Sequence, residues 1–317
     1  MKNLSWLPPD LRQRLKTIVP KVYQESVFSS FSLERPTTLR TNTLKTTTED
    51  LQKTFKMGGI NVQRYRPLPD AYTLIGKTTI RQLTSLDIYQ KGYFYVQSLS
   101  SMLPPLFLEP QPGQEILDMT ASPGSKTTQM AAIMKDTGSI TALESNQVRV
   151  YKLLANLKIQ GVENTKVVRT DARFFWRDHR EKYDKVLLDA PCSGEGRIRF
   201  SDPSTYTHWS VKEVKRMHFL QRSLIFSALN CLRPGGLLVY STCTLAPEEN
   251  EAVIDFALTK FAGRLEIEDP PLTLPNFCPA LRSFAGVEFN RSVQKAVRIY
   301  SDEKFEGFFI CRIRKLG

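Results

Sequence analysis

The stretch VLLDAPCSGEG, from Val186 to Gly196, decides the fold. Its apolar residues lead directly to Asp189, and Pro191 and Gly194 then break the regular pattern around Cys192. Such a run is typical of a buried parallel strand that ends in a polar loop. In open α/β sheets ligands bind at the carboxyl ends of strands, so a carboxylate and a thiol at this point are candidates for chemistry. The alternative is an ordinary strand end, whose Asp caps a turn and whose Cys packs as a small apolar side chain.

A second stretch of the same kind, GLLVYSTCT from Gly236 to Thr244, also ends in a thiol, that of Cys243. From residue 115 onward, strand-like runs alternate with helix-like runs. The predicted strands cover residues 115–119, 140–144, 165–170, 185–190, 236–244, 264–268 and 305–315. The predicted helices cover residues 127–135, 146–160, 211–232 and 248–261. This alternation predicts the α/β class, with a doubly wound parallel sheet covered by helices on both faces.

Residues 1–95 are predicted to form a small N-terminal α+β module that binds RNA, and residues 96–317 the catalytic domain. One helix is expected after Pro8-Pro9-Asp10, and a second between a capping box at Thr46-x-x-Glu49 and the pair Gly58-Gly59. Short strands are expected at residues 36–44, 60–66 and 71–75. Later in the chain, the Pro- and Phe-rich segment 270–286 is expected to be a coil that faces the substrate.

The overall charge favours a polyanionic partner. Lys and Arg number 44 against 32 for Asp and Glu, which gives a net charge of +12. Within the module, LRTNTLK (39–45) mixes cations with small hydrogen-bonding side chains, so Arg40, Asn42 and Lys45 are predicted RNA contacts. Arg197, just after the Pro-Cys loop, is predicted to be another. The alternative is that these polar residues simply contact solvent, on an edge strand or elsewhere on the surface.

The five cysteines are widely spaced, form no Cys-x-x-Cys pair, and have no ligand spacing with the three histidines. Disulfides and a metal site are therefore not expected, and a reducing compartment, the cytoplasm, is. The sequence has no uncharged apolar run long enough to cross a bilayer and no signal-peptide core at its start.

The loop after the first predicted strand of the sheet resembles a cofactor loop. It reads DMTASPGSKT (118–127), and its small residues allow a ligand to approach the backbone at the start of a helix. A P-loop NTPase is rejected, because Thr120 and Ser125 stand where that motif needs glycines. Glu144 ends the next strand, where an acid accepts ribose hydroxyls, and Asp171 follows the third, where an acid receives an adenine amino group. Together these features predict S-adenosylmethionine, although each acid alone is more often a turn or cap residue.

The candidate cofactor-binding residues are Thr120, Ala121, Ser122, Pro123, Gly124, Ser125, Lys126, Glu144, Arg149, Asp171 and Asp189.

Three motifs resemble the S-adenosylmethionine-dependent RNA 5-methylcytosine methyltransferases of the Fmu/Sun and nucleolar type. They are DMTASPGSKT (118–127), DAPCSGEG (189–196) and YSTCTLAPEENE (240–251). The early RTNTLK and the late Gly307-Phe308-Phe309 match as well, so the likeness covers about residues 36 to 313. Thr120 and Ser125 stand where Cys and Gly are common in that family. The resemblance implies a Rossmann-like class I methyltransferase fold and a tRNA or rRNA substrate.

The chemistry of cytosine explains why two thiols and a carboxylate would converge. C5 is too electron-poor to attack a sulfonium methyl group, so a thiolate must first add at C6. Asp189 is placed to hydrogen-bond N3 and the exocyclic amine of the base. Either Cys192 or Cys243 could attack on chemical grounds, and the resemblance implies that Cys243 is the nucleophile and that Cys192 assists release of the product. Lys126 could support the acid or lower the pKa of a thiol, or simply face solvent.

Two other functions compete with this interpretation. A DNA cytosine-5 methyltransferase also uses a Pro-Cys motif, but the second thiol and the lack of a large target-recognition insert argue against it. A non-catalytic RNA-binding assembly factor would keep the fold without turnover, but Cys192, Cys243, Asp189 and Lys126 are all present. We therefore predict an RNA cytosine-5 methyltransferase that acts as a monomer.

Overall fold

The computed structural model describes residues 4–76 and 78–317. The chain divides into two compact units, the first made of Met1–Arg35 and Ala172–Gly317 and the second of Pro36–Asp171. Neither boundary coincides with residue 95, and the RNA-binding role expected of residues 1–95 stays a prediction.

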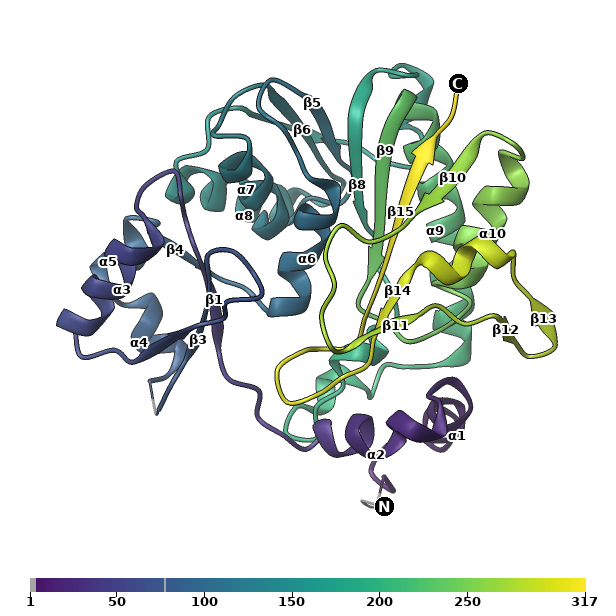
Figure 1. The fold of residues 1–317 in the computed structure, drawn as a ribbon, viewed down its shortest axis with the longest axis horizontal. Coiled ribbons are helices and arrows are strands. Elements are labelled where there is room, and N and C mark those ends of the chain that lie inside the picture. The colour runs from purple at the N-terminus through teal and green to yellow at the C-terminus, as the bar shows by residue number, and fades with distance from the viewer. Residues whose placement is uncertain (1–3, 77) are drawn as a thin grey trace. The chain divides into compact units, whose positions relative to one another are not determined.

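The first unit is built on a sheet in which β8 and β9 are parallel and the other pairs are antiparallel. Its strand order is β11-β14-β15-β9-β8, and β10 pairs with β15 (Figure 1). The strands are β8 (Tyr183–Asp189), β9 (Leu232–Thr242), β10 (Leu265–Glu268), β11 (Phe277–Pro279), β14 (Val297–Ile299) and β15 (Phe308–Lys315). The three central strands are the apolar runs predicted near residues 185, 236 and 305.

Two long helices pack beside this sheet. α9 (Val211–Cys231) contacts β8 and β9, and α10 (Glu251–Lys260) packs on α9. α9 begins at Val211 because the Ser210 hydroxyl accepts a hydrogen bond from the Glu213 amide at 3.1 Å. Both helices were predicted from the sequence, and the structure confirms them. Short 3₁₀ helices complete the unit: η1 (Phe175–Arg177), η2 (Glu195–Arg197), η3 (Pro203–Thr205) and η4 (Arg291–Lys295).

The first two helices of the chain, α1 (Pro9–Ile18) and α2 (Lys21–Ser30), also belong to the first unit. Leu11, Leu15 and Ile18 of α1 share a buried cluster with Trp209 and Leu245, which corrects the expectation that this helix packs within residues 1–95. Helix α2 was not predicted, because its apolar positions are divided between core and surface and so give no clear period.

The second unit contains three parallel strands in the order β5-β6-β7. They are β5 (Glu115–Asp118), β6 (Ser139–Glu144) and β7 (Thr165–Arg169), and the helices beside them are α6 (Leu99–Leu108), α7 (Ser125–Ile133) and α8 (Gln147–Gln160). α8 ends where Gly161 adopts a φ of +70°, a left-handed conformation that favours glycine. The alternation predicted for residues 115–170 is confirmed.

The same unit holds an antiparallel sheet of order β2-β3-β1-β4, which confirms the predicted mixture of strands and helices in this region. Its elements are β1 (Thr38–Thr41), α3 (Thr48–Met57), β2 (Val62–Arg64), β3 (Ala71–Leu74), α4 (Ile80–Thr84), α5 (Asp87–Gln90) and β4 (Phe94–Val96). The cap of α3 is Thr47, whose hydroxyl accepts from the Asp50 amide at 3.1 Å, and not the predicted Thr46. Leu39, Phe55, Tyr72 and Phe94 form part of its buried core.

Residues 270–286 differ from the predicted coil. They include β11, which pairs with β14, and β12 (Ser283–Phe284), which forms a hairpin with β13 (Val287–Glu288). Their expected role at the substrate stays a prediction. Among the described residues, none of the helices has the length and apolar character needed to span a membrane.

Candidate active site

The parallel pairing of β8 with β9 brings the two predicted cysteines together. Asp189 pairs with Ser241, so both strands end at the same edge and their loops leave side by side. Cys192 lies in the first loop and Cys243 in the second, and both thiols are partly buried. Their Sγ atoms are 3.1 Å apart, which is a sulfur–sulfur hydrogen-bond distance.

The two thiols have opposite electrostatic environments. The pKa of Cys243 is lowered, first by the hydrogen bond from Cys192 and then by the positive charge of Arg197. The pKa of Cys192 is raised well above its ordinary value, by the hydrogen bond to Cys243 and by burial. The pair therefore favours a thiolate on Cys243 and a neutral thiol on Cys192, the arrangement that a Cys243 nucleophile requires.

The backbone of η2 fixes Arg197 beside this thiolate. The Gly196 amide donates to the Cys243 carbonyl at 3.0 Å, and the Gly307 amide donates to the Gly196 carbonyl at 2.9 Å. A Cβ at Gly196 would lie 2.0 Å from the Gly307 carbonyl oxygen, so only glycine allows this close approach. Arg197 itself is solvent-exposed, and its predicted contact with RNA stays a prediction.

Asp189 lies at the end of β8, within electrostatic reach of Cys243, whose pKa its charge raises. Its Oδ1 accepts a hydrogen bond from the Ser241 hydroxyl at 2.7 Å. That bond fixes one oxygen of the carboxyl group at the same sheet edge as both thiols.

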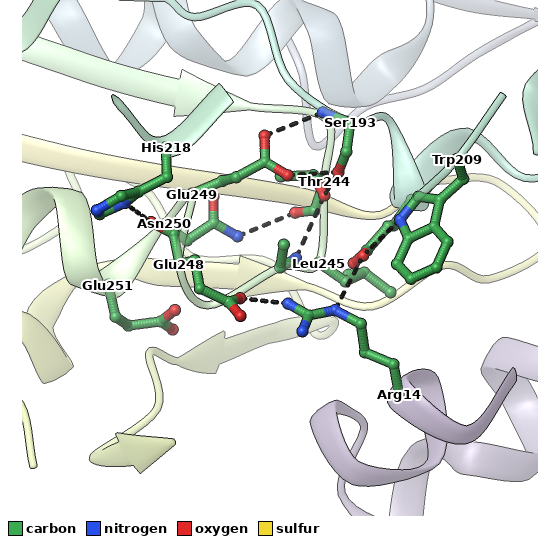
Figure 2. A network of polar contacts seen from close by, with 12 residues as sticks. Arg14, Ser193, Trp209, His218, Thr244, Leu245, Glu248, Glu249, Asn250 and Glu251 are labelled. Atoms are coloured by element: carbon green, nitrogen blue, oxygen red, sulfur yellow. Dashed lines mark hydrogen bonds and ion pairs between the residues drawn. The ribbon is translucent and has the colours of Figure 1, made fainter. Parts of the chain in front are cut away.

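The buried carboxylate of Glu249 connects the two cysteine loops (Figure 2). It accepts hydrogen bonds from the backbone amide of Ser193 at 2.9 Å, from the Ser193 hydroxyl, and from Gln221 Nε2 at 2.9 Å. The Ser193 hydroxyl lies 2.8 Å from the hydroxyl of Thr244. Because Ser193 gives its proton to Glu249, Thr244 donates to Ser193 while accepting from the Ala246 amide at 3.2 Å. Ser193 follows Cys192 and Thr244 follows Cys243, so this chain of bonds sets the separation of the thiols.

The remaining polar residues of the second loop hold it in place from other directions. Asn250 donates to the Thr244 carbonyl at 3.0 Å (Figure 2). Glu251 and Arg298 form a fully buried bidentate ion pair, with both N–O distances 2.6 Å. Arg298 also donates to the Leu245 carbonyl at 2.9 Å. Removing one member of such a pair typically costs about 3–5 kcal/mol, because the other charge is left buried alone.

The first loop is anchored through Glu195, which lies between α1 and the loop that precedes α9. Trp209 Nε1 donates to Glu195 Oε1 at 3.0 Å, and Arg14 Nε approaches the same oxygen at 3.4 Å. Arg14 also pairs with Glu248 (Figure 2). Burial raises the pKa of Glu195, and Arg14 opposes that shift. The first helix of the chain therefore supports both cysteine loops.

No local sequence pattern predicts these supporting residues. The run Glu248–Glu251 stands out only as part of a family motif, and nothing in its spacing indicates which carboxyl group is buried. Gln221 and Arg298 lie 28 and 47 residues from their glutamate partners, so no local pattern connects them. The one available signal is the concentration of acids just after a strand-end thiol.

In the second unit, the predicted cofactor loop lies between β5 and α7. Gly124 has a φ of +106° and precedes α7, and no side chain caps the first turn of that helix. Arg149 closes the loop, since its Nη2 donates to the Ser122 carbonyl at 2.9 Å while the Ser122 hydroxyl donates to the Arg149 carbonyl. Lys126 is buried and donates to the Ser101 hydroxyl at 3.0 Å. Thr120, Ala121, Pro123 and Ser125 complete the loop and the first residue of the helix.

The two predicted acids follow the next strands. Glu144 is the last residue of β6 and is buried, with Oε1 accepting from the Asn146 amide at 2.9 Å and Oε2 3.2 Å from Arg149 Nε. Asp171 comes two residues after β7 ends at Arg169. Two acids at successive strand ends, beside a loop with uncapped helix amides, are a donor and acceptor set that fits the ribose and adenine of S-adenosylmethionine.

Two of the predicted RNA contacts need correction. Arg40 is buried and donates to Gln97 Oε1 at 3.0 Å and to Thr128 Oγ1 at 3.1 Å. Asn42 is also buried and donates to the carbonyl oxygens of Gly92 and Gln160. Both side chains stabilise the second unit from within and are not available at its surface. Lys45 is exposed, but its ammonium group donates hydrogen bonds to two backbone carbonyls, at 2.7 Å each.

The alternating strands and helices, the glycine loop after β5 and the acids after β6 and β7 define a Rossmann-like methyltransferase fold. A methyltransferase homologue from Pyrococcus horikoshii has the same fold, with a TM-score of 0.80 and 33% identity over 98% of this chain and 100% of that one. NSun6 from P. horikoshii, solved with SFG, gives a TM-score of 0.84 and 26% identity over 99% of this chain and all of that one.

Residues 105–314 match the model of the family described as 16S rRNA methyltransferase RsmB/F, and the chain belongs to this family. A tRNA (cytosine(49)-C(5))-methyltransferase from Pyrococcus abyssi is 43% identical over 72% of each chain. A 26S rRNA (cytosine-C(5))-methyltransferase from Caenorhabditis elegans is 37% identical over 89% of this chain, and the ribosomal RNA small subunit methyltransferase F of Vibrio parahaemolyticus is 35% identical over 98%. This chain spans only 42% and 63% of the length of these two rRNA enzymes.

The first prediction concerns the reactivity of the thiols. Because only Cys243 has a lowered pKa, iodoacetamide at pH 7 should alkylate Cys243 well before Cys192, as peptide mass spectrometry will show. Replacing Arg197 by Gln removes a positive charge and should move the alkylation profile of Cys243 to higher pH. Arg216→Gln, on the exposed side of α9, is the matched control. Cys231, whose pKa burial raises to about 12, serves as an internal unreactive thiol. Faster alkylation of Cys192 would contradict the assignment.

The second prediction concerns Glu249, whose pKa burial raises from 4.5 to about 7. A carboxyl group with a raised folded-state pKa contributes stability below its unfolded value, and this contribution is lost as the pH rises through 7. The stability of the wild type relative to Glu249→Gln should therefore fall by up to about 3 kcal/mol between pH 4.5 and pH 8, a shift of 2–3 pKa units being worth this much.

Urea unfolding of both proteins at a series of pH values measures this difference. Glu266→Gln, which removes an exposed carboxyl group from β10 of the same unit, is the control. Parallel profiles for wild type and Glu249→Gln would show that Glu249 does not titrate between folded and unfolded states as its burial implies.

Proposed function

We propose that this protein transfers a methyl group from S-adenosylmethionine to C5 of a cytosine in tRNA or rRNA, through a covalent bond between Cys243 and C6 of the base. The observation that carries the proposal is the pair of thiols 3.1 Å apart at adjacent strand ends, with the pKa of Cys243 lowered. Membership of an RNA methyltransferase family supports the substrate class. Relatives named for tRNA and for rRNA are both similar to the chain, so the proposal covers both.

The proposed reaction begins with Cys243. Its thiolate adds to C6, forming an S–C6 bond and placing electron density on C5. Asp189, held by Ser241, hydrogen-bonds the polar edge of the base and so stabilises the charge that develops there. S-adenosylmethionine, when bound, supplies an electrophilic methyl group to C5. Loss of the C5 proton to a base then returns an electron pair to the ring, breaks the S–C6 bond and releases Cys243 as a thiolate.

The structure supports a proton-accepting role for Cys192 in the release step. The leading causes of its raised pKa are the hydrogen bond to Cys243 and burial, and the charge of Cys243 adds to them. Once Cys243 is bonded to C6 its sulfur carries no charge, so the contributions from Cys243 disappear. The pKa of Cys192 then falls, so its thiol loses its proton to solvent more readily, and the resulting thiolate can accept the C5 proton.

In the second unit, the residues proposed to hold S-adenosylmethionine are the loop from Thr120 to Ser125, with Lys126, Arg149, Glu144 and Asp171. Glu144 would accept the ribose hydroxyls and Asp171 the adenine amino group, while the first amides of α7 face the loop. The cofactor contact expected of Asp189 stays a prediction. A cytoplasmic monomer stays a prediction, as do RNA contacts by Lys45 and Arg197.

The third prediction separates the roles of the two cysteines. Purified wild type with labelled S-adenosylmethionine and cellular RNA should yield 5-methylcytidine, and Cys243→Ala should yield none. Cys192→Ala should accumulate protein covalently attached to RNA, because addition and methylation proceed while release does not. The products are digested to nucleosides for chromatography, and the adduct is detected on a denaturing gel.

Cys231→Ala, a buried thiol outside the site, is the control and should retain activity. If Cys192→Ala is inactive and Cys243→Ala forms the adduct, the reaction stands and the roles are reversed. Labelling of DNA alone would favour the DNA methyltransferase alternative, and no labelling of either nucleic acid would favour a non-catalytic RNA-binding factor.

The fourth prediction tests the cofactor residues by binding alone. Glu144→Gln should weaken binding of S-adenosylmethionine by about 10- to 100-fold in calorimetry, because a charged acceptor for two hydroxyls is lost. Gln retains the acceptor for the Asn146 amide, so the loop should stay folded. Glu163→Gln, an exposed acid in the same unit, is the control. Equal affinities for Glu144→Gln and wild type would remove Glu144 from the site.

A further inference from the structure

A groove rich in aromatic rings lies in the first unit, away from the cysteine loops. It has a volume of about 500 Å³ and lies between η1, α9 and α10, of which α9 and α10 are labelled in Figure 1. The rings that line it are Phe174, Trp176, Phe219, Phe226 and Phe256. This volume is within the range of ligand-binding clefts. We call this feature the aromatic groove.

The rings of the aromatic groove are unusually open to solvent. Phe219 of α9 is 62% exposed, and Phe174, the residue before η1, is 49% exposed. Trp176 packs edge-on against Phe226, with ring centroids 5.5 Å apart, which fixes the floor of the groove. Exposed aromatic faces above a rigid floor mark a binding surface more often than a solvated one.

Arginines provide the charge of the groove, and no acidic side chain lines it among the described residues. The guanidinium of Arg177 lies 4.9 Å from the ring centroid of Phe174, and that of Arg222 lies 4.0 Å from the ring centroid of Phe256. Neither Arg177 nor Arg222 forms an ion pair within residues 4–76 and 78–317. Arg173 lines the groove as well. Guanidinium groups stacked on rings keep their hydrogen-bonding edges directed outward, available to the oxygens of an anion.

We propose that the aromatic groove binds a single-stranded segment of the RNA substrate outside the cytosine that is modified. Bases would stack on Phe174 and Phe219, and phosphates would receive hydrogen bonds from Arg177 and Arg222. Aromatic platforms beside cations are the combination that proteins use to bind single strands without reading their sequence. The substrate class rests on the proposed function, but binding to the groove needs no catalysis.

Charge complementarity distinguishes RNA from the other possible occupants. A second copy of this chain, with its net charge of +12, would bring more positive charge to a groove already lined by three arginines. An acidic peptide would satisfy the arginines but offers few planar groups for the five rings. RNA supplies both a phosphate at each nucleotide and a flat base beside it.

The groove is separate from the residues assigned to catalysis. Cys192, Cys243, Asp189 and the cofactor residues are all absent from its lining. Changes in the groove should therefore alter the affinity for RNA and leave the chemical step unchanged, which provides a way to test the groove independently of methyl transfer.

The experiment measures binding of a fluorescent 12-nucleotide oligouridylate, which contains no cytosine, to the full chain by anisotropy at several salt concentrations. The Phe174→Ala/Phe219→Ala variant should bind about tenfold more weakly, because stacking of one or two bases is lost. Arg177→Gln/Arg222→Gln should weaken binding and lower the slope of log affinity against log salt by about 1.4, about 0.7 for each phosphate contact on a single strand. Arg177→Gln alone, at an exposed position, repeats the test if Arg222 is needed for folding.

The matched control is Arg291→Gln/Val287→Ala, which removes an exposed cation and an exposed apolar side chain elsewhere in the same unit. Apart from the weaker binding that follows from the loss of one positive charge, this variant should bind oligouridylate within twofold of wild type. With methylatable RNA, the groove variants should raise KM and keep kcat. If wild type is inactive but oligouridylate binding still depends on the groove, the proposed function fails and this inference stands.

Three outcomes would overturn the inference. The groove variants could bind oligouridylate as well as wild type does. A Glu- and Tyr-rich peptide could bind the groove while oligouridylate does not, which would identify a protein partner. Sedimentation could show a dimer that the groove variants convert to a monomer, which would make the groove an interface between copies.

Discussion

The parallel register of β8 and β9 is the constraint on which the active site depends. Because Asp189 lies opposite Ser241, the strands end together, and their loops place two thiols within hydrogen-bond distance. A shift of the register by one residue would turn every side chain of one strand to the opposite face. The separation of Cys192 and Cys243 therefore depends first on the pairing of the two strands and only then on the conformation of either loop.

Two glutamates two residues apart then fix the loops in different ways. Glu251 has a bidentate arginine partner, so its charge is compensated inside the protein. Among the described residues, the Glu249 carboxyl group accepts hydrogen bonds only from neutral groups of Ser193 and Gln221, and burial raises its pKa to about 7. Glu251 therefore supports its loop permanently. Glu249 instead links the geometry of the thiols to a proton that exchanges near neutral pH. A neutral Glu249 would reverse the direction of the hydrogen bond to the Ser193 hydroxyl, and the hydroxyl could then donate to Thr244.

Local patterns in the sequence predicted the strands and helices well, because buried parallel strands are continuous apolar runs and helix ends carry caps such as Ser210 and Gly161. Both cysteines could be placed at strand ends for the same reason. The burial of Arg40 could not be predicted, because a cation hydrogen-bonded to neutral side chains inside a unit and a cation on its surface have the same local sequence. The membership of α1 in the first unit was missed as well, since its partners Trp209 and Tyr300 lie about 200 and 290 residues further along the chain.

The arrangement of α9 explains how binding in the aromatic groove could matter for a reaction at the thiols. Gln221 points from this helix to Glu249 and to the Pro191 carbonyl, which it reaches at 2.8 Å, while Phe219 and Arg222, three residues apart, share the face that lines the groove. Successive helical residues point about 100° apart, so one rigid turn carries both sets of side chains. An RNA strand held by the groove is thus held by the helix that also positions the cysteine loops. The groove can therefore determine the position of the RNA strand without any motion within the site. In this respect it acts as a docking surface and not as a switch.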